Sequence, residues 1–129
     1  MPTNNPNEKP LVWLASAKRD LLALPVEVVR DIGHALGFAQ LGRIHGDAVP
    51  MKGFGGASVV EIRVNFNKDT FRGVYTVRFQ GAVYVLHVFK KKSKTGIATP
   101  KEDLDLITSR LKTAEQHHAE HFANEEENP

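Results

Sequence analysis

The chain has 129 residues, of which 41% are hydrophobic and 25% charged, with a formal net charge of +2. This composition is typical of one soluble globular domain, and the absence of cysteine excludes disulfides, thiolate metal sites and cysteine nucleophiles. No apolar run reaches the roughly 18 residues of a membrane span. Because residues 1–10 also lack the basic and apolar parts of a signal peptide, we expect a cytoplasmic protein.

The N-terminal third is predicted to contain one strand and two helices. Residues 1–10 hold three prolines and three asparagines, which predicts a disordered leader. The apolar run LVWLA (11–15) predicts a strand, and Ser16 is placed to cap a helix that begins AKRDLLAL. Pro25 interrupts this helix and is suited to the first turn of a second one. The second helix has one apolar face, formed by Val28, Ile32, Leu36 and Ala39.

From residue 58 the hydrophobic period changes to two, as in a half-buried strand. In VVEIRVNF, apolar residues alternate with Glu61, Arg63 and Asn65. The runs TFRGVYTVRF (70–79) and AVYVLHVF (82–89) follow after short turns. Connections this short require antiparallel neighbours, so residues 58–90 are predicted to form a three-stranded meander.

A third helix is predicted from Thr99-Pro100-Lys101-Glu102. Threonine is suited to the cap, proline to the first position, and the glutamate to completing a capping box. The helix has an apolar stripe of Leu104, Ile107, Leu111 and Ala114. We therefore expect a single domain over residues 11–114, and a frayed, polar and acidic tail over 115–129.

These elements predict an α+β fold, in which a small antiparallel sheet has two N-terminal helices on one face and a C-terminal helix. We expect one sheet face to stay uncovered, with Glu61 and Arg63 pointing from it. The side chain of His87, within an apolar strand, is expected to pack in the core.

Charge is unevenly distributed along the chain. Residues 50–100 hold nine basic and two acidic side chains, a net charge of +7, whereas residues 101–129 hold three basic and eight acidic, a net charge of −5. The basic segment includes Arg63, Arg72 and the lysines at 90, 91, 92 and 94. Such a segment is typical of surfaces that bind nucleic-acid phosphates, and arginine does so through two parallel hydrogen bonds. Alternatively, the cations are a solvated face whose lysines prevent edge-to-edge aggregation.

The runs MKGFGG, VVEIRV, TFRGVYTV, VYVLHVFKKKSKT and TPKEDLD resemble, in order and spacing, the phage-derived HigB branch of the RelE/ParE toxin superfamily. The resemblance covers residues 11–112. It implies a RelE-like fold and the toxin of a type II toxin–antitoxin system. It further implies a ribosome-dependent mRNA endoribonuclease, in which the ribose 2′-hydroxyl attacks the adjacent phosphate. The implied partners are the ribosome, mRNA and a HigA-like helix-turn-helix antitoxin, for which residues 16–41 are one docking surface.

The resemblance also implies roles for individual residues. Arg63, Arg72 and Lys91 match basic positions of the family; Arg72 and Lys91 are assigned to transition-state charge or the leaving oxygen, with Lys90 in support. Glu61 is a candidate base, or else orients Arg63. RNA-binding positions are expected at Lys52, Arg78, Lys92 and Lys94, with no cofactor. One departure concerns acid–base chemistry, because residues 93–103 lack the tyrosine that RelE uses there.

Two other functions remain open at this point. A ParE-type toxin would inhibit gyrase without cutting RNA, although a protein target gives less reason for so many cations. A non-catalytic RNA- or DNA-binding module would share the basic surface without the chemistry. The segment HHAEH (117–121) matches an H-x-x-E-H zinc pattern, but it lies in a polar tail with no well-placed third ligand, so we expect no metal site.

Overall fold

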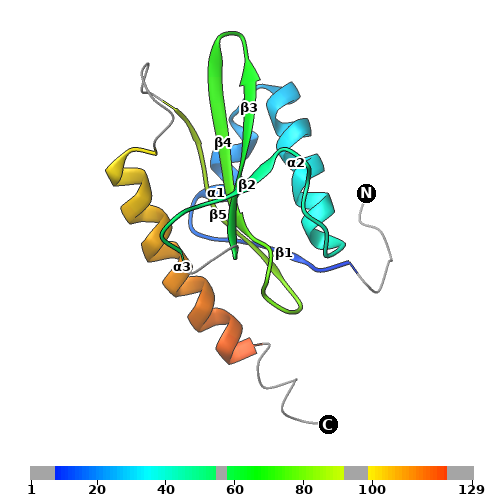
Figure 1. Ribbon diagram of the computed structural model, residues 1–129, viewed down its shortest axis with the longest axis vertical. Coiled ribbons are helices and arrows are strands. Elements are labelled where there is room, and N and C mark those ends of the chain that lie inside the picture. The colour runs from blue at the N-terminus through cyan, green and yellow to red at the C-terminus, as the bar shows by residue number, and fades with distance from the viewer. Residues whose placement is uncertain (1–7, 55–57, 92–98, 122–129) are drawn as a thin grey trace.

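The protein, seen in a computed structural model that describes residues 8–54, 58–91 and 99–121, is built on one five-stranded sheet (Figure 1). Among these residues, no helix combines the length and apolar character needed to cross a bilayer. The elements are β1 (Leu11–Trp13), α1 (Ala17–Leu22), α2 (Val26–Gln40), β2 (Ala48–Pro50), β3 (Val59–Phe66), β4 (Asp69–Thr76), β5 (Val83–Lys90) and α3 (Lys101–His121).

The strand order is β1-β5-β4-β3-β2. Strands β3, β4 and β5 form the predicted antiparallel meander. Strand β2 adds to β3 in antiparallel orientation, whereas β1 pairs with β5 in parallel, with Leu11 opposite Val83. The α+β prediction is therefore confirmed, but the sheet is mixed rather than wholly antiparallel. The parallel pair is possible because the intervening helices and strands carry the chain back to the same end of the sheet.

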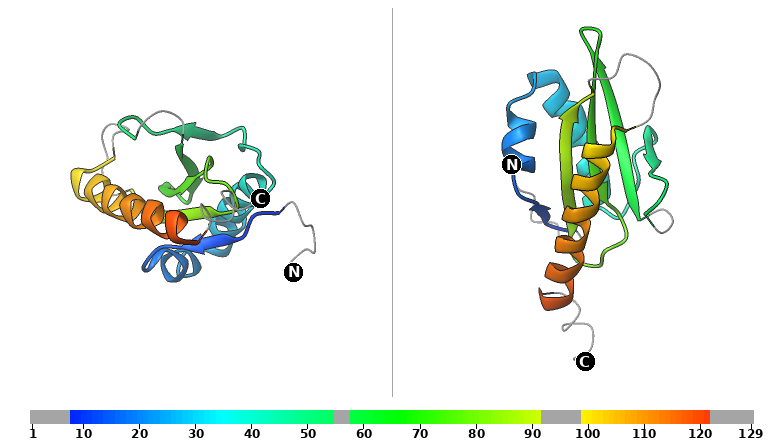
Figure 2. Two further views of the ribbon diagram at one scale, coloured as in Figure 1. Left: turned by 90° about the horizontal axis from the view of Figure 1, so that it is seen from below. Right: turned by 90° about the vertical axis from the view of Figure 1, so that its left-hand side faces the viewer.

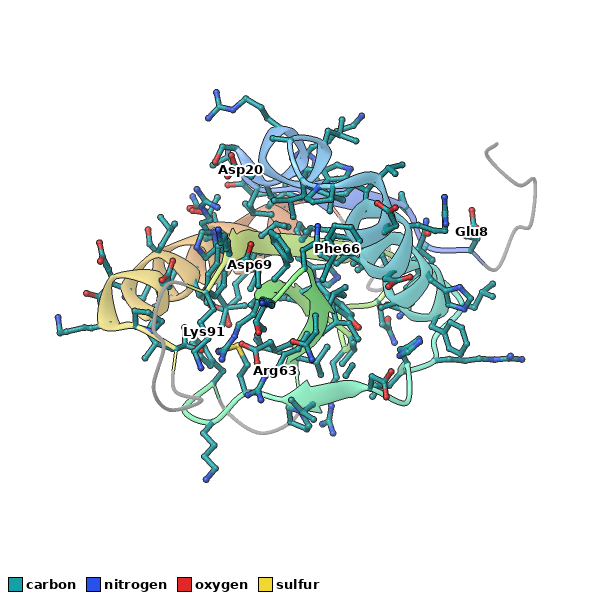
Figure 3. The ribbon with its side chains drawn as sticks, turned by 90° about the horizontal axis from the view of Figure 1, so that it is seen from above. Glu8, Asp20, Arg63, Phe66, Asp69 and Lys91 are labelled. Carbon is teal, nitrogen blue, oxygen red and sulfur yellow. The ribbon has the colours of Figure 1, made fainter. Side chains whose placement is uncertain are left out.

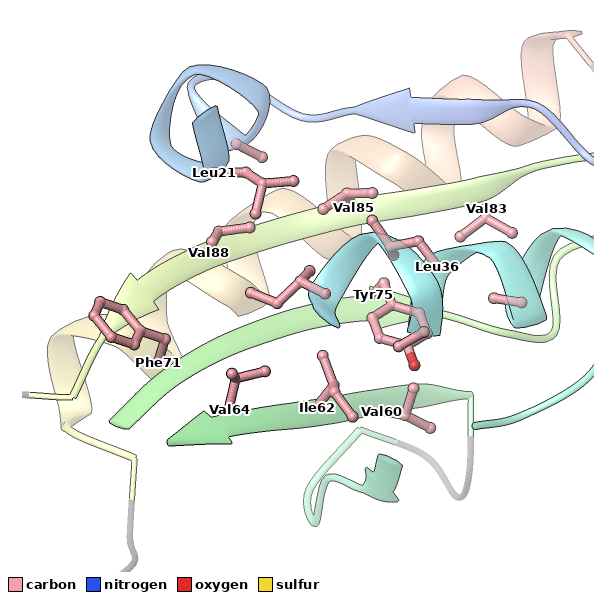
Figure 4. Close-up of a cluster of buried hydrophobic side chains, with 14 of the residues drawn as sticks. Leu21, Leu36, Val60, Ile62, Val64, Phe71, Tyr75, Val83, Val85 and Val88 are labelled. Carbon is pink, nitrogen blue, oxygen red and sulfur yellow. The ribbon is translucent and has the colours of Figure 1, made fainter. Parts of the chain in front are cut away.

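Alternation along the strands divides the core into two layers. Val60, Ile62 and Val64 face α1 and α2, in the cluster that Figure 4 shows. Val59 and Val74 point the other way and share a second cluster with Ile107 and Ala114 of α3. Figure 2, in its right-hand view, shows both N-terminal helices on one side of the strands and β2 on the other.

The expectation of an uncovered sheet face is wrong. Residues of α3, together with Leu14 and Met51, pack on the face opposite α1 and α2. Glu61, which points to this side, is only 2% exposed. This second face is thus a packed core where α3 covers it, whereas Arg63, nearer the β3–β4 hairpin, stays partly exposed.

Both ends of the predicted domain also need correction. The Lys9 amide donates to the Gln40 carbonyl at 2.8 Å, and the Gln40 side chain donates back to the Lys9 carbonyl at 2.9 Å, so the leader predicted over 1–10 is attached to α2 at Lys9. Helix α3 continues past Ala114 to His121. There Nδ1 of His117 lies 2.7 Å from the Tyr84 hydroxyl. Beyond Ala114, where the apolar stripe of the helix ends, polar and aromatic contacts hold the helix against the sheet.

Candidate functional site

Two arginines and a glutamate form the centre of the candidate site. Arg63 of β3 lies directly opposite Arg72 of β4, and Glu61 precedes Arg63 by two residues, so all three share a sheet face. Nε of Arg63 donates to Oε1 of Glu61 at 2.7 Å, and Nη1 of Arg72 donates to Oε2 at 3.1 Å. One carboxylate therefore holds two guanidinium groups next to each other.

Thr99 joins this cluster from the segment that precedes α3. Its hydroxyl oxygen accepts a hydrogen bond from Nη1 of Arg72 at 2.9 Å and lies 3.4 Å from Oε2 of Glu61. The predicted capping role of Thr99 is therefore corrected: a buried guanidinium needs acceptors, and this hydroxyl supplies one. The first turn of α3 instead uses the Pro100 carbonyl, which accepts from the amides of Asp103 and Leu104.

Burial separates the functions of the two arginines. The Arg72 side chain is 1% exposed and that of Glu61 3%, whereas that of Arg63 is 39% exposed. Of the two arginines, Arg63 is the one that a ligand from solvent can touch. Arg72 lies behind it, where it fixes the carboxylate and contributes positive charge, so the expectation that Arg72 contacts a phosphate directly does not match its burial.

Lys91 supplies a further cation to the same face. Its amide donates to the Thr70 carbonyl at 2.8 Å, which continues the β4–β5 ladder and places its side chain on the same face as Arg72. Figure 3, viewed from the hairpin end, shows Arg63 and Lys91 together on the side away from α1. Partial desolvation lowers the pKa of Lys91, and the charges of Arg72 and Arg63 lower it further against the opposing effect of Glu61.

Other predicted site residues lie elsewhere. Lys90 is opposite Phe71, on the face that α2 covers, and its ammonium pairs with Asp69 at 3.2 Å, so it does not support Lys91. Arg78 follows β4 and is exposed at the opposite end of the β4–β5 pair from Lys91. Lys92 and Lys94 lie outside the described residues.

Lys52 borders the candidate site through a cavity of about 400 Å³, whose lining also includes Glu61, Arg63 and Thr99. Lys52, predicted as an RNA-binding position, thus lies beside Arg63, whereas sequence reasoning did not include Thr99 or β2 in the site. A threonine hydroxyl beside a basic strand end can either cap a helix or accept a hydrogen bond from a cation. Which of these two roles Thr99 takes depends on how α3 packs against the sheet, which is a long-range property.

His87 is buried, as predicted, and it attaches α3 to the sheet. Its Nε2 lies 2.8 Å from Oδ1 of Asp103, and its ring stacks on Phe89 with 4.5 Å between centroids. Burial lowers the pKa of His87 and outweighs the opposing effect of the Asp103 carboxylate; Arg110 lowers it further and Asp20 raises it. We assign His87 to the packing of α3, next to the candidate site but not in it.

No cluster of three or more His, Asp, Glu or Cys side chains suited to a metal ion occurs in the part of the chain that the structure describes. In the segment HHAEH, the ring of His117 instead contacts Tyr84, and Nε2 of His118 lies 2.7 Å from the Gln80 carbonyl oxygen.

Comparison with known proteins identifies the family. The model of the phage-derived Gp49-like proteins (DUF891) matches residues 19–112. The chain belongs to this family. No curated protein matches it significantly. Among solved structures, the toxin–antitoxin complex RelBE2 from Mycobacterium tuberculosis is similar, with 19% identity and a TM-score of 0.44 over 67% of this chain and 94% of that chain.

Proposed function

We propose that this Gp49-like protein is the HigB-type toxin of a toxin–antitoxin pair, and that it acts in the cytoplasm by cleaving mRNA on the ribosome. One observation carries the proposal. Arg63 of β3 and Lys91, which directly follows β5, present positive charge on one sheet face, over a buried Glu61–Arg72 pair that fixes the position of Arg63. A backbone phosphate of RNA fits such a site in charge and in hydrogen-bonding geometry.

The reaction uses groups of the RNA and of this site, with solvent water as the acceptor of the 2′-hydroxyl proton. As that proton leaves, the ribose 2′-oxygen attacks the adjacent phosphorus in line and the bond to the 5′-oxygen breaks. The products carry a 2′,3′-cyclic phosphate and a 5′-hydroxyl. Negative charge develops on the phosphoryl oxygens, where Arg63 and Lys91 stabilise it. The lowered pKa of Lys91 also suits it to give a proton to the leaving 5′-oxygen.

Glu61 is assigned to orientation rather than to base catalysis. Both of its carboxylate oxygens accept hydrogen bonds from arginines, and its side chain is 3% exposed. With both oxygens occupied and the side chain buried, the carboxylate is out of reach of the ribose 2′-hydroxyl, but it aligns the Arg63 guanidinium for a phosphate. Arg72 and Thr99 complete the support, and an antitoxin that covers Arg63 and Lys91 would inhibit the enzyme.

Mapping of RNA ends after induced expression tests this function. We expect new 5′-hydroxyl ends in translated mRNA, and their loss when the neighbouring antitoxin gene is co-expressed. Arg63→Ala and Lys91→Ala should each reduce cleavage by about 100-fold or more, while Arg78→Ala, which removes the same charge at the far end of the sheet, should keep it. Undiminished cleavage in the Arg63 and Lys91 variants would refute the assignment, and arrested replication without new RNA ends would favour gyrase as the target.

A further inference from the structure

A second feature of the site is the cavity of about 400 Å³ beside Arg63. The proposed phosphate contacts with Arg63 and Lys91 do not fill it. Its apolar wall comes from β2 and the first turn of α3, and consists of Val49, Pro50, Met51 and Leu104. Val49 is 44% exposed, a high value for a large apolar side chain next to a concave surface. A flat apolar ligand could cover this wall.

The other wall of the cavity is polar. Glu61, Arg63 and Thr99 line it, and the exposed Lys52 adds a cation. Arg63 therefore belongs to both the phosphate-binding face and the cavity. A ligand whose anionic group contacts Arg63 has an apolar surface within reach on one side.

We propose that this cavity holds the base of the nucleotide next to the phosphate that Arg63 and Lys91 bind, an inference that rests on the proposed RNA cleavage. A nucleobase has an apolar face and a polar edge. The face would lie against Val49, Met51 and Leu104, and the edge toward Thr99 and Lys52. Burial of the base face against these aliphatic side chains would remove apolar surface from water and so favour binding.

A second cavity, of about 340 Å³ between α2 and β3, does not suit a nucleotide as well. Arg63 lines this cavity too, but with the two carboxylates of Asp31 and Asp47, whereas the cavity beside β2 combines Arg63 and Lys52 with the single carboxylate of Glu61. Carboxylates repel a phosphate, so the charge of the two cavities favours the one beside β2.

Binding of small probes tests the base site without requiring catalysis. Adenosine 5′-monophosphate and ribose 5-phosphate carry the same phosphate and sugar, but only the first has a base. In NMR titrations of the full chain, we expect AMP to shift the resonances of Val49, Met51 and Leu104 and, through the apolar area that its base buries, to bind about tenfold more tightly than ribose 5-phosphate. Leu104→Trp, which fills the cavity, should remove this difference.

Leu106→Trp is the matched control, because it places the same ring in the same helix at a residue that is 36% exposed and does not line the cavity. Thermal unfolding of both variants would check that they fold, and Val49→Trp is a second way to fill the cavity. Equal affinity of AMP and ribose 5-phosphate for the wild type would overturn the base site.

The outcomes for the base site and for cleavage can be separated. If the wild type cuts mRNA but Leu104→Trp and Val49→Trp keep the same cleavage positions, the cavity does not hold a base while the catalytic proposal stands. If AMP binds in the cavity but no 5′-hydroxyl ends appear in cells, the base site stands and the protein is an RNA-binding module. Altered cleavage positions in both cavity variants, but not in Leu106→Trp, would support both proposals.

Discussion

Nη1 of Arg72 lies 3.1 Å from Oε2 of Glu61, and the two side chains are 1% and 3% exposed. A buried ion pair contributes little net stability against an apolar pair, but the loss of one partner leaves an uncompensated charge. We therefore expect Glu61→Leu to reduce the free energy of unfolding by about 3–5 kcal/mol. The double variant Glu61→Leu/Arg72→Met should recover part of this loss.

Urea unfolding of the wild type, both single variants and the double variant measures the coupling between these side chains. Arg63→Met is a useful control, since the Arg63 side chain is 39% exposed and its loss should cost much less. A double variant whose loss of stability equals the sum for the two single variants would show that the pair is not coupled.

Removal of the Tyr75 hydroxyl is expected to stabilise the fold. The ring is fully buried near Leu36 and Val60 (Figure 4), and the hydroxyl has no hydrogen-bond partner among the described residues. An unsatisfied buried polar group costs about 1–3 kcal/mol, so Tyr75→Phe should raise the free energy of unfolding by about 1 kcal/mol.

The raised pKa of Tyr75 also predicts a loss of stability at alkaline pH. Burial raises its pKa to about 12, above the ordinary value of 10.0. Above pH 10 the unfolded chain loses this proton while the folded chain keeps it, so stability falls as pH rises from 10 to about 12. Denaturant unfolding at pH 9 and pH 10.5 should show a smaller fall in Tyr75→Phe than in the wild type; equal falls would contradict the assignment.

The lowered pKa of His87 predicts a loss of stability at mildly acidic pH. Its pKa is lowered by burial, so below pH 6.5 the unfolded chain binds a proton that the folded chain binds less readily. Stability contributed by the neutral imidazole is therefore present above pH 6.5 and lost as pH falls below it. The size of this effect also depends on nearby charges, since Asp103 and Asp20 raise the pKa of His87 and Arg110 lowers it.

The matched comparison for His87 uses two variants. We expect His87→Gln to show a smaller decrease in unfolding free energy between pH 7.5 and 5.5 than the wild type, because glutamine does not titrate. His34→Gln, which changes an exposed histidine on α2, is the comparison variant for loss of a histidine side chain away from α3. An unaltered pH dependence in His87→Gln would mean that another group causes the loss.

Two glycines should respond to alanine in opposite directions. A Cβ atom at Gly73 in β4 would lie 3.2 Å from Cγ2 of both Ile32 and Ile62, whereas a Cβ atom at Gly33 in α2 would have nothing within 4 Å. Gly73→Ala should therefore destabilise the fold by about 1–3 kcal/mol through overpacking. Gly33→Ala should stabilise it by about 0.5–1 kcal/mol, because alanine favours the helix. Thermal unfolding compares the two, and a stable Gly73→Ala variant would show that α2 shifts easily over the sheet.

Local patterns predicted much of the fold. The apolar face of α2 and the alternation of β3 are properties of consecutive residues, and both match the structure. Strand β2 has only three residues, too few to show a period, and its pairing depends on the exposed edge of β3. The parallel pairing of β1 is likewise a long-range property that no local window contains.

The candidate site was predicted less completely, for similar reasons. The cross-strand pair Arg63–Arg72 follows from the short β3–β4 turn, so sequence reasoning could bring these residues together. Because successive side chains of a strand point to opposite faces, Lys90 and Lys91 could have been predicted to lie on different faces. Their adjacency in the sequence instead suggested that both bind the same phosphate. By contrast, the burial of Arg72 and the contact with Thr99 depend on how the segment before α3 packs, which the pattern does not encode.

The parallel pairing of β1 with β5 has a consequence for how the chain folds during synthesis. Leu11 leaves the ribosome early, but its partner, Val83, is translated 72 residues later. Until then the first strand has no neighbour in the sheet, and α1 and α2 have no complete surface on which to pack. Contacts so distant in sequence slow folding. The nascent polypeptide should therefore acquire its native structure only after β5 has left the ribosome, and a binding protein that recognises the finished sheet would find no target on shorter nascent chains.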